Sequence, residues 1–174
     1  SVYVSGDATA AYDAPVQRAH RAIIFQRPGT LATIDHVAAD RPLRWEWNLH
    51  TRQPLQRMSS HRFRLYDEQA KAGVCLDIIE PAEFDFVQSD RFTTPPEPSA
   101  LRPPQWHAVL SLKSAAATAT FVVGMSIDCN ASTAPVRSRG GRFVPLRVAR
   151  VLRLVHRGRE ARPRSIRRAG ERAG

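Results

Sequence analysis

The sequence predicts an all-β protein folded as an antiparallel β-sandwich. Short segments rich in Val, Ile, Phe, Thr and Trp alternate apolar and polar residues with a period of two, and turn residues separate them. Long segments with the helical period of 3.6 residues are missing. A chain of 174 residues is long enough for one domain with a substantial core.

Nine segments show the alternation expected of strands. They are residues 2–5, 16–26, 30–37, 43–51, 61–66, 74–79, 84–87, 106–113 and 119–127. Between the second and third lies Arg27-Pro28-Gly29-Thr30, a tight-turn sequence, because proline restricts φ at one turn position and glycine accepts positive φ at the next. These two segments are therefore expected to pair as a hairpin.

The clearest alternation is in residues 43–51. The apolar set is Leu43, Trp45, Trp47 and Leu49, and the polar set is Arg44, Glu46, Asn48 and His50. Successive strand residues point to opposite faces, so the segment predicts one core face and one polar face. Burial of both tryptophans between sheets is the favoured interpretation, and an outward platform that stacks on sugar rings is the alternative.

Composition divides the chain into a body, residues 1–134, and an Arg-rich tail, residues 135–174. The formal net charge is +10, but the body has 13 basic and 14 acidic residues (13 − 14 = −1), whereas the tail has 13 Arg and 2 Glu (13 − 2 = +11). We expect the tail to be irregular or disordered. The leading hypothesis is a shifted reading frame of a GC-rich gene, and a genuine basic arm for nucleic acid or anionic polysaccharide is the alternative.

Several classes are not favoured. The body has no RNP-type aromatic motif, helix-turn-helix signal or zinc-finger spacing, so nucleic-acid binding would depend on tail charge alone. No apolar run approaches the eighteen residues of a membrane span.

Cys75 and Cys129 lie in apolar segments, so two buried thiols are predicted, with a single bridge as the alternative. The proline-rich residues 93–104 predict an extended surface loop.

Four blocks of the sequence resemble one family. They are YVSGDATAAY at residues 3–12, VQRAHRAIIF at 16–25, LATIDHV at 31–37 and WEWNLHT at 45–51. In this order they resemble the C-terminal β-sandwich of the heparinase II/III-like polysaccharide lyases, which include alginate and oligoalginate lyases. The resemblance covers residues 1 to about 130.

The resemblance implies part of a supersandwich in a longer lyase that cleaves uronic-acid polysaccharides by β-elimination. The partner would be an acidic polysaccharide, alginate or a glycosaminoglycan, and the compartment periplasmic or extracellular. The family takes most of its reacting groups from a preceding helical toroid, so this segment is expected to be a non-catalytic wall of the cleft. A stand-alone carbohydrate-binding module is the alternative function.

Three residues are candidate site residues. His50 matches a strand histidine that some relatives use as a ligand of zinc inside the sandwich, which implies a structural Zn site in the longer protein. Arg18 and Arg21 are candidate contacts to a substrate carboxylate or sulfate, because a guanidinium matches such groups as a fork. The adjacent Asp35 and His36 are expected not to pair, and Asp35 is expected to end its strand and bond local backbone.

Overall fold

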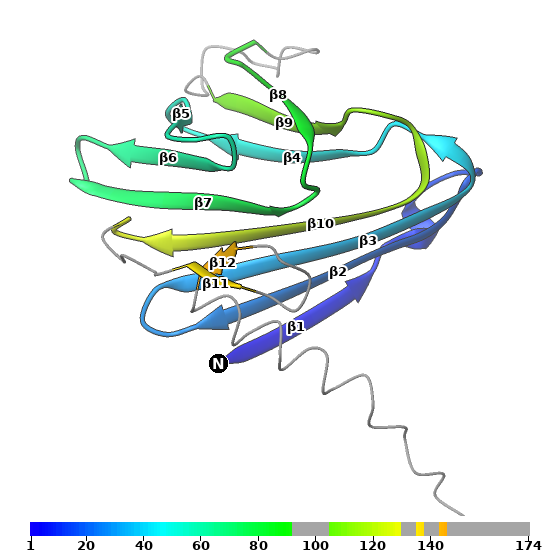
Figure 1. The fold of residues 1–174 in the computed structure, drawn as a ribbon, viewed down its shortest axis with the longest axis horizontal. Helices are drawn as coiled ribbons and strands as arrows, with labels where there is room; N and C mark the ends of the chain where they lie inside the picture. The colour runs from blue at the N-terminus through cyan, green and yellow to red at the C-terminus, as the bar shows by residue number, and fades with distance from the viewer. Residues whose placement is uncertain (92–104, 130–134, 138–142, 146–174) are drawn as a thin grey trace, which may run out of the picture.

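The computed structural model describes residues 1–91, 105–129, 135–137 and 143–145 of the chain (Figure 1). In this part the regular structure is β-strand apart from one 3-10 turn, η1 (Thr9–Ala11), and every strand pair is antiparallel. The predicted all-β, antiparallel class is confirmed. Among the described residues, no helix has the length and apolar content needed to cross a bilayer.

Two sheets of unequal size make up the body. The seven-stranded sheet has, in spatial order, β1 (Val2–Asp7), β2 (Val16–Gln26), β3 (Thr30–Leu43), β10 (Ala116–Ile127), β7 (Ala72–Glu80), β6 (Arg62–Asp67) and β5 (Gln56–Arg57). The three-stranded sheet has β4 (Glu46–Thr51), β9 (Trp106–Leu112) and β8 (Phe84–Ser89). All nine predicted segments form strands, and β2 and β3 form the predicted hairpin around residues 27–29.

The segment predicted as one strand over residues 43–51 is two strands. Leu43 ends β3, where it pairs with Ala116, whereas β4 begins at Glu46 and pairs with β9. The chain changes sheet at Arg44 and Trp45, which an alternation pattern cannot reveal because the inward and outward directions persist across the crossing. Trp47 is buried and the polar set is exposed, so the predicted faces are confirmed.

The main core lies between the three-stranded sheet and one half of the seven-stranded sheet. Its buried members are Trp47, Leu55, Phe63, Leu76, Ile78, Phe84, Ala108, Leu110, Phe121 and Val123. None comes from β1, β2 or β3. In Figure 1 the three-stranded sheet accordingly lies near β5 and β6, away from β1.

A second apolar cluster lies on the opposite face of the seven-stranded sheet. It consists of Ala22, Ile24, Ala32, Ile34 and Val122, with Ile79 packed against it. Cross-strand partners share a face, and Val122 alternates with the core residues Phe121 and Val123. This sheet therefore has buried apolar residues on both faces, which is typical of an inner layer.

The two cysteines are disulfide-bonded, so the prediction of two free buried thiols is wrong. Strand β10 pairs with β7 up to Ile127 and Val74. Asp128 and Cys129 then have φ values of 61° and 23°, which turn the chain so that Cys129 lies beside Cys75, with a Cα–Cα distance of 5.1 Å. The two cysteines are 54 residues apart in the sequence and become neighbours only because β7 pairs with β10. Their spacing alone therefore does not identify the bond.

Little of the predicted tail lies in the described part. There, β11 (Pro135–Arg137) pairs with β12 (Phe143–Pro145), so the tail is not irregular throughout. The predicted proline-rich loop, residues 93–104, lies outside the described residues.

Opening the disulfide should destabilise the body. The bond closes a loop across 54 residues, and loop-closure entropy gives it roughly 2–4 kcal/mol of stabilisation. We expect the double variant Cys75→Ser/Cys129→Ser to lose about this much free energy of unfolding in urea titrations. Reductant should lower the stability of the parent chain equally and leave the double variant unchanged. Equal stability of the reduced and oxidised parent would contradict the expectation.

Candidate functional site

A cavity of about 270 Å³ lies where β3 leaves the seven-stranded sheet and β4 begins. The residues around it are Ala8, Tyr12, Ala19, His20, Arg21, Asp35, Val37, Trp45, Glu46, Trp47 and Phe121. They come from the η1 turn, the β2–β3 hairpin, the crossing segment and β10. We call it the fork cavity.

An ion pair forms the polar wall of the fork cavity. Arg21 donates from Nε to Asp35 Oδ1 at 2.5 Å and from Nη2 to Asp35 Oδ2 at 3.1 Å. The Asp35 side chain is 12% exposed and that of Arg21 is 51% exposed. The expectation that Asp35 ends a strand and bonds local backbone is wrong: it lies within β3, directly opposite Arg21 in the hairpin register.

Arg18 and Arg21, the two candidate substrate contacts, are not brought together. They are three residues apart in regular β-structure, so their side chains leave opposite faces of β2. Arg18 lies near Asp7, whose carboxyl feels its positive charge, and Arg21 is the partner of Asp35. A substrate carboxylate at Arg21 would have to use the remaining guanidinium N–H groups.

The block around Asp7 holds the η1 turn against β2. Thr9 donates to Asp7 Oδ1 from its hydroxyl at 2.5 Å and from its backbone N–H at 2.8 Å, and the Ala19 N–H donates to Thr9 Oγ1 at 2.9 Å. Hydrogen bonds from the Thr9 hydroxyl and N–H, together with electrostatic interaction with His20 and Arg18, lower the pKa of the Asp7 carboxyl. This clamp places Ala8 and Tyr12 beside the fork cavity.

Trp45, where the chain changes sheet, and Trp47 of β4 both point toward the core. Trp47 is 4% exposed, and its Nε1 has no hydrogen-bond partner among the described residues. Trp45 is half-buried and donates from Nε1 to the carbonyl of Ala116 at 2.8 Å. Neither ring forms an outward stacking platform.

His50, the candidate zinc ligand, lies on the exposed face of the three-stranded sheet. Its ring stacks on His107 of β9, with ring centroids 4.5 Å apart and planes 5° from parallel. His107 Nε2 bonds Asn48 Oδ1 at 2.7 Å. A tetrahedral zinc needs three or four donors, and the described residues contain no group of three His, Cys, Asp or Glu side chains placed for a metal. His50 would be one donor of such a site, and the remaining donors would have to come from elsewhere.

His36 and His61 have local partners. His36 Nδ1 bonds Thr120 Oγ1 at 3.1 Å, on the face opposite Asp35, so the expectation that Asp35 and His36 do not pair is confirmed. His61 bonds Ser60 Oγ and the carbonyl of Ala82. Sequence reasoning missed the stacking of His107 on His50, because β9 and β4 are brought together by the fold.

Comparison with known proteins shows the fold. No protein-family model and no curated protein sequence matches the chain. Among solved structures, heparinase III, the BT4657 gene product with methylated lysines, aligns with a TM-score of 0.52 and 12% identity over 77% of this chain and 20% of that chain. The heparan sulfate lyase HepC from Pedobacter heparinus aligns with a TM-score of 0.48 and 13% identity, over 76% and 24%.

The chain thus shares the fold of a region of heparinase III and spans about one fifth of that protein's length. The predicted resemblance is confirmed at the level of the fold.

Breaking the ion pair from one side should cost stability. In Arg21→Met the Asp35 carboxylate loses both donors while largely buried, so we expect the free energy of unfolding to fall by about 1–3 kcal/mol. The double variant Arg21→Met/Asp35→Leu should lose less, because it leaves no unpaired charge. Urea titrations measure both. A double variant less stable than the single one would contradict this account.

The Asp7 clamp should open in acid. A carboxyl with a lowered folded pKa stabilises the fold above its unfolded value of about 3.9 and loses that contribution as the pH falls through the folded pKa. Amide protection factors at Thr9 and Ala19 should therefore fall below about pH 4. Asp7→Asn should show the same loss at neutral pH, and Asp13→Asn, in the same loop, should not. Unchanged protection in Asp7→Asn would contradict the role of the clamp.

Proposed function

We propose that residues 1–134 are the β-sandwich part of a longer polysaccharide lyase that cleaves uronic-acid-containing polysaccharides by β-elimination. The observation that carries the proposal is the likeness in fold to heparinase III over 77% of this chain. In such a reaction a base removes the proton α to the uronate carboxylate while nearby donors stabilise the developing charge, and the 4-linked sugar leaves.

The part played by this segment is to wall one side of the substrate cleft without supplying the reacting groups. Two of the polar groups at the fork cavity, Arg21 and Asp35, are already engaged with each other in a two-bond pair. Apolar residues on both faces of the seven-stranded sheet support its place as an inner layer of a supersandwich.

The substrate class we propose first is a glycosaminoglycan, because the structural neighbour that supports the fold is a heparinase. Alginate stays an alternative on the sequence resemblance, and Arg18 and Arg21 stay candidate contacts to the polymer.

A stand-alone carbohydrate-binding module is the second candidate function. The inward direction of Trp45 and Trp47 weighs against it, because such modules commonly present aromatic faces outward to sugar rings.

A structural zinc remains a proposal for the longer protein. His50 would be the ligand from this segment, since it is exposed on one face of the three-stranded sheet. The metal would tie this face to another part of the protein that supplies the remaining donors.

We propose a periplasmic or extracellular location, and the disulfide supports it. Structural disulfides persist in oxidising compartments and are rare in the cytosol.

For the tail, we propose that a shifted reading frame begins near residue 135, with a basic arm as the alternative. Coding DNA in which no single-base shift restores strand-like alternation after that point would exclude the first.

The lyase proposal is tested by ultraviolet absorbance of unsaturated uronate ends, with heparan sulfate, heparin and alginate as substrates. We expect no turnover by this chain alone and turnover by a longer polypeptide that includes the coding region before Ser1. Turnover by this chain would show that it holds its own reacting groups and so overturn the wall assignment. An inactive, folded longer polypeptide would contradict the lyase proposal.

A further inference from the structure

Positive charge in the body is concentrated in one short stretch. Residues 52–64 contain four arginines and no acidic residue. The body holds 13 basic and 14 acidic residues in all, so outside this stretch it has 13 − 4 = 9 basic and 14 acidic residues, a net of 9 − 14 = −5. A polyanion is therefore attracted to this stretch and repelled by the rest of the body.

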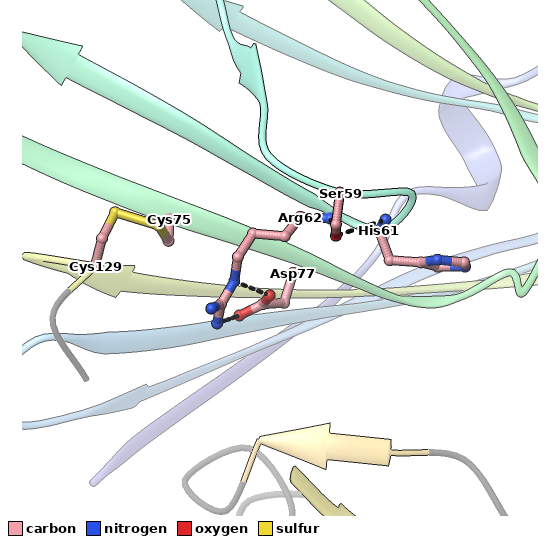
Figure 2. Close-up of polar contacts among 6 residues, drawn as sticks. All are labelled: Ser59, His61, Arg62, Cys75, Asp77 and Cys129. Atoms are coloured by element: carbon pink, nitrogen blue, oxygen red, sulfur yellow. Dashed lines mark hydrogen bonds and ion pairs between the residues drawn. A yellow bond between two sulfur atoms is a disulfide. The ribbon is translucent and has the colours of Figure 1, made fainter. Parts of the chain in front are cut away.

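The stretch includes the hairpin formed by β5 and β6, at the edge of the seven-stranded sheet opposite β1. We call residues 52–64 the basic hairpin. Figure 2 shows its turn at Ser59 and His61, with Arg62 reaching across to Asp77 of β7. The Ser59 hydroxyl accepts the N–H groups of His61 and Arg62, which fixes the turn.

Three of the four arginines, Arg52, Arg57 and Arg64, have no carboxylate partner among the described residues. Arg62 is paired with Asp77, at 2.7 and 3.0 Å, and that hydrogen bonding raises the pKa of Arg62. Arg57 donates only to the carbonyls of Ser59 and Ser60, with its guanidinium 5.5 Å from the centre of the Phe63 ring. Arg64 lies 4.7 Å from the centre of the Tyr66 ring, and its buried Nε lacks a hydrogen-bond partner.

The basic hairpin is fixed to the rest of the body by buried side chains and by hydrogen bonds to Gln88. Phe63 is 1% exposed and Leu55 is 4% exposed. The Gln88 side chain of β8 accepts from the Leu55 N–H at 2.9 Å and donates to its carbonyl at 3.0 Å, so the hairpin is attached to both sheets. Charged side chains on such a support bind with a smaller entropy loss than on a loose loop.

We propose that the basic hairpin binds an anionic sugar polymer that passes over this edge of the sheet. Its sulfate or carboxylate groups would contact Arg57 on the core-side face, where Arg57 pairs with Phe63, and Arg64 on the opposite face, where Arg64 pairs with Gln56. This inference rests on the proposed function and names a surface of this chain that would contact the polymer. Guanidinium N–H groups match the oxygens of sulfate and carboxylate as a fork. Nucleic acid fits less well, because Phe63 is buried in the core and the Arg64 guanidinium already lies against the Tyr66 ring, so neither ring is free to stack on bases.

The test is the affinity of the full chain for a heparin-derived tetrasaccharide, measured by calorimetry at several salt concentrations. The variant Arg57→Ala/Arg64→Ala should bind about tenfold more weakly, and its salt slope should fall by about 2. The matched control Arg27→Ala/Arg91→Ala removes the same charge from exposed body positions and should stay within about twofold of the parent. The tail arginines contribute equally to both variants.

Two further readouts keep the test decisive where a variant folds poorly. Amide exchange of the unmodified chain should slow at residues 56–66 when the tetrasaccharide is bound. Equal weakening in hairpin and control variants, or protection confined to other residues, would overturn the proposal, as would equal competition by a single-stranded DNA of the same charge. The outcome is independent of the lyase assay. If a longer polypeptide is active but the hairpin variant binds the tetrasaccharide as well as the control does, only the binding site is wrong. If the hairpin binds the tetrasaccharide but the longer polypeptide is inactive, only the lyase proposal is wrong.

Discussion

The structure depends on burying an apolar core between two sheets of unequal width. Three strands cannot cover seven, so the main core takes its members from β10, β7 and β6 and from the whole of the smaller sheet. The half made of β1, β2 and β3 contributes none. Here the inward face of the larger sheet accommodates a charged pair, Arg21 and Asp35, and the fork cavity beside it. The polar site is therefore a consequence of incomplete coverage.

Alternation along the sequence predicted nine strand segments and the two faces of residues 43–51, because burial of one face imposes a period of two, but it missed the two-residue β5. It could not predict where the chain changes sheet, since exposed and less exposed residues go on alternating from Leu43 to His50 across the crossing. The pairing of Cys75 with Cys129 was equally hidden, because it requires β7 and β10 to be neighbours. One contact that was missed could have been predicted from the sequence. The hairpin turn at residues 27–29 sets a register in which Arg21 lies opposite Asp35.

The sequence block that includes Asp7 and Thr9 has a mechanical explanation in this fold. Two hydrogen bonds to one carboxylate oxygen and a third to the Thr9 hydroxyl fasten the turn after β1 onto β2. In this fold the block thus serves to place a turn. The same reasoning separates the candidate arginines, because Arg18 assists this clamp electrostatically while Arg21 belongs to the cavity wall.

The bond between Cys75 and Cys129 also determines how the body would bear mechanical load. Tension applied to the chain beyond residue 129 passes through the sulfur atoms into β7 before it reaches the hydrogen bonds between β10 and β7. Those hydrogen bonds are then shielded from peeling at that end. Whatever follows residue 129 is anchored to two adjacent strands at once, so a pull on it is resisted by covalent bonds rather than by the last rung of a ladder.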